Sequence, residues 1–159
     1  MWTMIRTEDP DGGGLVLAKI KTGLQSDWIL EEMMKVAMED EKSDAEKYRH
    51  LAKSAKKEKD RSVLFAIADE ERRHRKALQY LYHTFFGKEA EEPHRRNDPH
   101  RDSFAEAIRK SIVSEYAGVS FYREIMHRIP DDRLRMPIRK IMADEQKHAQ
   151  MLEGLLEYK

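Results

Sequence analysis

Two short stretches, "EERRH" at residues 70–74 and "DEQKH" at residues 144–148, decide how this sequence is interpreted. Each has a Glu three residues before a His, a spacing that places both side chains on one face of a helix. By helical period, the same face otherwise carries hydrophobic residues. Each motif therefore puts a carboxylate and an imidazole where core residues are expected.

The hydrophobic pattern around these motifs predicts four helices. Apolar residues recur at alternating steps of three and four, the spacing of helices that pack into a bundle. These stripes cover residues 30–51, 64–81, 104–125 and 138–155. We expect residues 26–159 to form an all-α four-helix bundle, with a crossover linker at about 87–101 and an N-cap at Ser26 or Asp27. Residues 1–25 are expected to be a lead-in that is flexible or forms a short helix or strand.

The two halves of the predicted bundle repeat each other at an offset of 74 residues. The related pairs are Glu41 and Glu115, Tyr48 and Tyr122, Glu71 and Glu145, and His74 and His148. Within each half the two Glu residues are 30 positions apart, and a predicted turn lies midway between them. Residues equidistant from the turn of an antiparallel hairpin lie at the same height. Two such hairpins, packed as a bundle, would gather four carboxylates and two imidazoles at one level.

Such a cluster is favourable only if cations neutralise it, because each desolvated carboxylate costs on the order of several kcal/mol. A Glu from each of two helices, with Glu-x-x-His from the other two, is the ligand pattern of di-iron and di-manganese bundles. The oxygen-rich set favours two iron ions, with manganese or a mixed pair as alternatives. We expect Glu71 and Glu145 to bridge the two metals, and Glu41 and Glu115 to be terminal ligands of one metal each. His74 and His148 are expected to bind one metal each. The hydroxyls of Tyr48 and Tyr122 are expected to donate hydrogen bonds to the terminal carboxylates.

Two features leave alternatives open. A lone Glu-x-x-His on a charged helix is more often part of a solvated face, and six repeated residues could be a degenerate repeat that has lost its metal. Asp44 occupies a stripe position one turn after Glu41, where the second half has Gly118. It is an additional ligand, a hydrogen-bond partner of a ligand His, or a carboxylate that reaches solvent between helices.

The composition limits the classes of function. With 30 basic and 30 acidic residues the net charge is near zero, so no bulk field attracts nucleic acid or an anionic membrane. The absence of Cys excludes disulfides, thiolate catalysis and iron–sulfur clusters, and it suits a reducing cytoplasm. No apolar run approaches the length of a membrane span, and the first residues lack the pattern of a signal peptide. We therefore expect a cytoplasmic protein with neither nucleic acid nor a membrane as its partner.

Residues 27–157 resemble the di-iron domain of rubrerythrins, in the ferritin-like superfamily. The resemblance lies in the stretches "EDEKSDAEKYRHLAKSA", "IADEERRH", "SEYAGVSFYREI" and "MADEQKH". It implies a ferritin-like bundle with a long crossover between the second and third helices, in a homodimer or larger homo-oligomer. It also implies a di-iron site whose usual activity is the reduction of hydrogen peroxide. Some relatives oxidise ferrous iron or react with dioxygen.

The sequence departs from the rubrerythrin pattern in two ways. Rubrerythrins carry a Cys-bound iron in a rubredoxin domain, so a chain without Cys requires a separate electron-donor protein. They also have an additional Glu where this chain has Gly118, and that Glu exchanges with a His as the oxidation state changes. We predict a non-haem di-iron oxidoreductase that reduces hydrogen peroxide or dioxygen. The alternatives are a ferroxidase or iron-storage protein and, third, a metal-free interaction bundle.

Overall fold

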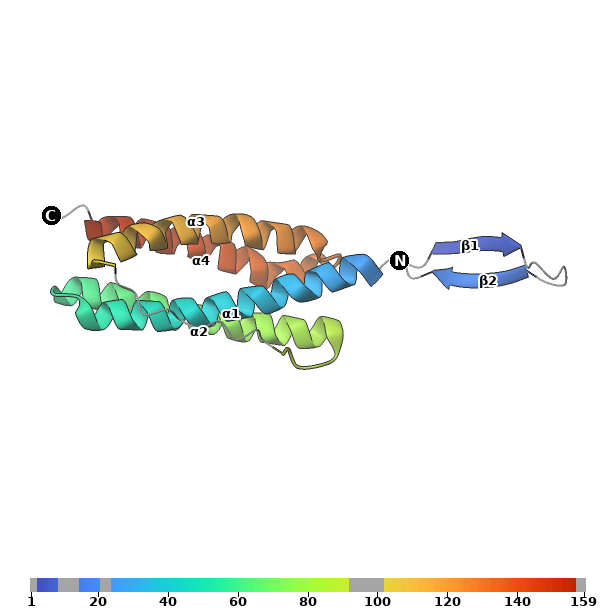
Figure 1. The fold of residues 1–159 in the computed structure, drawn as a ribbon, viewed down its shortest axis with the longest axis horizontal. Helices are drawn as coiled ribbons and strands as arrows, with labels where there is room; N and C mark the ends of the chain where they lie inside the picture. The colour runs from blue at the N-terminus through green and yellow to red at the C-terminus, as the bar shows by residue number, and fades with distance from the viewer. Residues whose placement is uncertain (1–2, 9–14, 21–23, 92–101, 157–159) are drawn as a thin grey trace.

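The computed structural model describes residues 3–8, 15–20, 24–91 and 102–156 of the 159-residue chain. These residues form two strands, β1 (Thr3–Glu8) and β2 (Leu15–Ile20), and four long helices. The helices are α1 (Leu24–Ser54), α2 (Glu58–Phe86), α3 (Phe104–Arg128) and α4 (Asp132–Leu156). The helices form two hairpins that lie side by side, α1 with α2 and α3 with α4 (Figure 1). The predicted four-helix bundle of two helical hairpins is confirmed.

The helices end and begin at residues whose chemistry favours those boundaries. Helix α2 ends before Gly87, whose φ of 67° is a left-handed conformation that favours glycine. Ser103 precedes α3 and forms a capping box with Glu106. Asp131 precedes α4, and its Oδ1 accepts a 2.9 Å hydrogen bond from the backbone N–H of Arg133. Most of the predicted crossover, residues 92–101, lies outside the described residues.

The predicted lead-in contains a β-hairpin. Strands β1 and β2 pair antiparallel, with Thr3 opposite Ile20 and Glu8 opposite Leu15. Helix α1 begins at Leu24, so the prediction that Ser26 or Asp27 caps the first helix is wrong. The physical reason is that a single Ser or Asp is compatible with several positions near a helix start, so the residue type alone does not fix the boundary.

The bundle core consists of two apolar clusters separated by a polar layer. One cluster contains Leu30, Met34, Leu81, Ile125 and Ile138, among others. The other contains residues from the opposite ends of the same helices, among them Leu51, Leu64, Ile67, Ile108 and Leu152. The buried charged residues of the Glu/His motifs lie on the stripes between these clusters. The polar layer is therefore closed above and below by apolar packing.

Candidate metal centre

The six predicted ligands come together in two overlapping sets. The first set is Glu41, Glu71, His74 and Glu145, and the second is Glu71, Glu115, Glu145 and His148. In each set, one potential ligand atom per residue lies within 4.8 Å of all the others. All six side chains are buried, with no residue more than 6% exposed. Glu71 and Glu145 belong to both sets, which is the arrangement expected of bridging carboxylates.

Each histidine directs its Nδ1 atom into the cluster. The Nδ1 of His74 is 2.9 Å from Oε2 of Glu71 and 3.4 Å from Oε1 of Glu145. The Nδ1 of His148 is 3.0 Å from Oε1 of Glu71. The two rings stack, with their centroids 5.6 Å apart. Both imidazoles therefore offer the same nitrogen to the space between the carboxylates.

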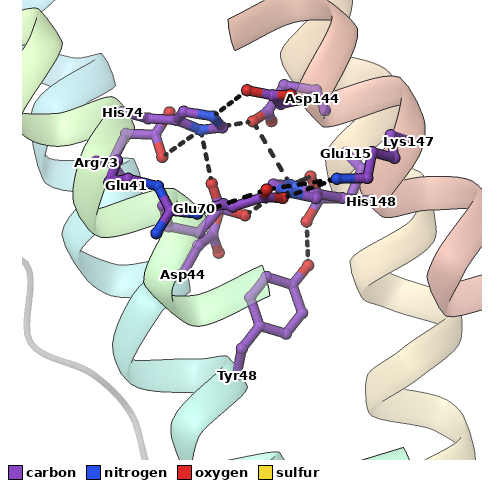
Figure 2. Close-up of polar contacts among 12 residues, drawn as sticks. Glu41, Asp44, Tyr48, Glu70, Arg73, His74, Glu115, Asp144, Lys147 and His148 are labelled. Carbon is purple, nitrogen blue, oxygen red and sulfur yellow. Dashed lines mark hydrogen bonds and ion pairs between the residues drawn. The ribbon is translucent and has the colours of Figure 1, made fainter. Parts of the chain in front are cut away.

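The opposite nitrogen of each histidine contacts a carboxylate that sequence reasoning missed. The Nε2 of His74 is 3.1 Å from Oδ2 of Asp144, and the Nε2 of His148 is 2.8 Å from Oε2 of Glu70 (Figure 2). Both contacts cross between α2 and α4. A carboxylate that accepts a hydrogen bond from Nε2 fixes the tautomer that leaves Nδ1 free to bind metal. The missed signal is that each acid directly precedes a motif Glu, at the same offset of 74 residues.

The two buried tyrosines also connect the hairpins. The hydroxyl of Tyr48 donates a hydrogen bond to Glu115, and that of Tyr122 donates to Glu41. Both tyrosines were expected to donate to the terminal carboxylates, and the structure adds that each reaches the carboxylate of the other hairpin. Burial and the adjacent carboxylates raise the pKa of both phenols well above its usual value. Both hydroxyls therefore remain protonated donors.

The charges of the cluster shift its pKa values in opposite directions. Burial raises the pKa of Glu145 to about 8, and the negative charges of Glu71 and Glu115 reinforce the effect. Burial also raises the pKa of Glu71, but contacts with His148 and His74 outweigh it and hold that pKa at about 2. Burial lowers the pKa of His148, but contacts with Glu115 and Glu71 raise it to about 11. Cation binding must therefore displace protons, because the ligands are carboxylates and neutral imidazoles.

The polar atoms of the second set fit a shared cation. Four buried atoms, one from each of its residues, make ion-pair contacts with one another or with His74 but no hydrogen bond of good geometry among the described residues: Glu71 Oε1, Glu115 Oε2, Glu145 Oε1 and His148 Nδ1. Each buried polar atom without a partner costs about 1–3 kcal/mol, or more when it is charged. A cation coordinated by these atoms removes that cost. Oxygen donors with one imidazole per set suit iron or manganese, so the buried Glu/His cluster can hold two such ions.

Asp44 lies beside this cluster rather than within it. Its Oδ1 is 2.6 Å from Nζ of Lys47, and its side chain is 28% exposed. Neither set includes Asp44, and the ligand histidines contact Asp144 and Glu70 instead. Of the three alternatives that the sequence leaves open, the structure agrees with a carboxylate that reaches solvent between helices.

Residues 32–103 match the family model of rubrerythrin. The match covers less than half of the chain and shows that this segment is similar to rubrerythrin. The predicted resemblance is thereby confirmed for a rubrerythrin segment that includes Glu41, Glu71 and His74. The second hairpin lies outside the matched segment, and it carries Glu115, Glu145 and His148 at the repeat offset of 74 residues.

The whole bundle has a structural counterpart. A hypothetical protein from Pyrococcus furiosus has a similar structure, with a TM-score of 0.73 and 24% sequence identity. The similarity covers 84% of this chain and 92% of that chain, and at this identity it shows the fold alone. No match was found among curated proteins. In residues 24–91 and 102–156, no helix has an apolar stretch long enough to cross a membrane.

Proposed function

We propose that this protein is a non-haem di-iron oxidoreductase that reduces hydrogen peroxide. The observation that carries the proposal is the pair of overlapping ligand sets that share Glu71 and Glu145. Two iron ions held there would supply the two electrons that break the O–O bond. Each hydrogen peroxide then takes up two electrons and two protons and yields two waters. The rubrerythrin match supports this class of chemistry.

The protein residues hold and isolate the reacting centre. Glu41 and Glu115 are each fixed by a tyrosine hydroxyl, so neither carboxylate can rotate freely. Asp144 and Glu70 orient the two histidines. The apolar clusters on either side limit the access of bulk water, which strengthens electrostatic interactions within the layer. This rigid arrangement favours binding of two ions at fixed positions over mobile storage of many.

The proposed reaction requires partners. We propose that a separate protein returns two electrons per turnover, since the given sequence has no Cys with which to bind a rubredoxin-type iron. We propose that this protein and its electron donor are both cytoplasmic, and that the bundle works as a homodimer or larger homo-oligomer. Dioxygen is the alternative oxidant.

A rapid-mixing experiment tests the proposed function. Anaerobic, ferrous-loaded protein is mixed with hydrogen peroxide or with dioxygen, and iron oxidation is followed by absorbance. We expect faster oxidation by peroxide, with one peroxide consumed per two irons, and repeated turnover when a reductant is added. Glu115→Gln should lose this reaction, whereas Glu124→Gln, an exposed residue of the same helix, should retain it.

Other outcomes would contradict the proposal. Oxidation by dioxygen alone, with iron uptake well beyond two ions per chain, would indicate a ferroxidase or storage protein instead. A loaded protein that neither oxidant affects would remove the enzymatic function.

A further inference from the structure

A cavity of about 470 Å³ lies between α1 and α3 and leads to the metal centre. Its rim includes the exposed residues Ser114 and Ala117. Its inner wall includes the buried carboxylates Glu41 and Glu145, which belong to the ligand sets. The cavity therefore connects the surface of the bundle with the polar layer.

Gly118 lies against Glu145 in the wall of this cavity. A Cβ at this position would lie 2.6 Å from Oε2 of Glu145, closer than a Cβ atom can approach. Without that Cβ, the Glu145 carboxylate reaches the cavity wall. The other carboxylate oxygen, Oε1, is buried and has no hydrogen-bond partner among the described residues. A group that arrives through the cavity therefore meets the Glu145 carboxylate, whose Oε1 faces the two histidines of the centre.

The chemistry of the cavity selects a cation. Four carboxylates line it, from Asp40, Glu41, Asp44 and Glu145, and two serines add hydroxyl oxygens. None of the described residues that line it is Lys, Arg or His. Oxygen donors of this kind bind divalent cations, and a cleft lined by one sign of charge raises the local concentration of counter-ions. A small neutral oxidant would gain nothing from these charges.

We propose that this cavity is the route by which divalent metal ions reach the dinuclear centre, with Asp44 as the residue that passes each ion to Glu41 and Glu145. The proposal rests on the metal centre of the proposed function. Asp44 suits this task because it lines the cavity, is partly exposed, and lies one turn from Glu41 on α1. Its partner Lys47 places a positive charge 2.6 Å from its carboxylate, and that charge opposes the approach of a cation.

The route predicts rate changes of opposite sign for the two partners. Asp44→Asn removes a negative charge and leaves the Lys47 ammonium without its partner, so metal uptake should slow. Lys47→Gln removes the positive charge and leaves the Asp44 carboxylate available, so uptake should accelerate. A unit charge acting on a divalent ion at ~6 Å in water-like surroundings corresponds to about a tenfold change in rate. Added salt should reduce both differences.

The test is stopped-flow mixing of metal-free protein with Co²⁺, with the ligand-field absorption of bound Co²⁺ as the signal. The rate constant reports the route, and the final absorbance reports the number of ions bound. We expect about tenfold slower uptake in Asp44→Asn and faster uptake in Lys47→Gln, both with the final absorbance of the parent protein. The matched controls are Asp69→Asn on α2 and Lys53→Gln on α1, two exposed residues that should leave the rate unchanged.

The outcomes separate the two proposals. Normal final absorbance with unchanged rates in both variants would overturn the route and leave the metal centre intact. Equal effects of Asp44→Asn and Asp69→Asn would also overturn it, because they would reflect net charge alone. If the parent protein binds no Co²⁺, both the route and the metal centre of the proposed function are overturned.

Discussion

At the scale of single residues, the carboxylates behind the two histidines complete the site. Sequence reasoning identified all six residues of the two sets because each is polar on an apolar stripe and recurs at one offset. It missed Glu70 and Asp144 because acids adjacent to a stripe are common on charged helices. Only the packing of α2 against α4 shows that each one contacts the histidine of the opposite hairpin.

We predict that Asp144→Asn and Glu70→Gln each weaken metal binding about 10–100-fold, because the amide no longer fixes the histidine tautomer as a carboxylate does. Competition against a chromophoric chelator measures the affinity. Asp69→Asn is the matched control, since Asp69 lies next to Glu70 but is 53% exposed and pairs with surface arginines. Parent-like affinity in both variants would mean that these carboxylates do not orient the ligands.

Gly118 and Gly154 offer a second comparison between similar residues. Both lie within helices, where Gly→Ala ordinarily stabilises by about 0.5–1 kcal/mol. A Cβ at Gly154 would have no described heavy atom within 4 Å, whereas one at Gly118 would collide with Glu145. We therefore expect Gly154→Ala to raise the free energy of unfolding by about that amount and Gly118→Ala to give no gain. Urea denaturation measures the free energy of unfolding of both variants. Equal stabilisation by Gly118→Ala and Gly154→Ala would contradict the close packing of Gly118 against Glu145.

At the scale of helices and strands, the hydrophobic periodicity predicts the four helices correctly, whereas single capping residues do not predict where the first helix begins. The stripes predicted four helices because each buries one face over about five turns or more, so the pattern repeats several times. The N-cap at Ser26 or Asp27 was wrong because a single polar residue can occupy several positions of a first turn. The sequence does not decide between a flexible segment, a helix and a strand for residues 1–25, because strands of six residues contain too few alternating positions.

The contact between α1 and α2 near Glu31 predicts a dependence of stability on pH. Its Oε1 is 2.9 Å from Nζ of Lys88 and accepts a 2.8 Å hydrogen bond from the Tyr82 hydroxyl. The hydrogen bond from Lys88, followed by that from Tyr82, lowers the pKa of Glu31 from 4.5 to about 2. A lowered folded-state pKa means that the carboxylate stabilises the fold above about pH 4.5, and that this contribution is lost as the pH falls toward 2.

We therefore expect Glu31→Gln to be less stable than the parent protein at pH 6, with the difference shrinking between pH 4.5 and 2. Urea denaturation between pH 2 and pH 6 measures the difference in free energy of unfolding. Glu32→Gln, whose side chain is 47% exposed, should show a much smaller difference. If the stability difference between Glu31→Gln and the parent protein grew as the pH fell, the pKa of Glu31 would not be lowered in the folded state.

At the scale of the whole molecule, the internal repeat explains how one short chain builds a symmetric centre. The first set takes three residues from the first hairpin and one from the second, and the second set reverses these proportions. Neither hairpin alone supplies a complete set. The repeat predicted this arrangement from the sequence, because equal spacing from the turns placed the ligands at one height. The crossing of Tyr48 and Tyr122 to the other hairpin could not be predicted, because it depends on how the hairpins pack.

The dinuclear centre can be tested by an anaerobic ferrous titration of metal-free protein, with the ions bound per chain counted at saturation. A dinuclear centre predicts saturation at two ions per chain. Glu71→Gln, which alters a residue shared by both sets, should abolish tight binding of both ions. Glu58→Gln, an exposed residue of the same helix, should bind as the parent protein does. Absence of tight binding, or unchanged binding in Glu71→Gln, would contradict the dinuclear centre and the function built on it.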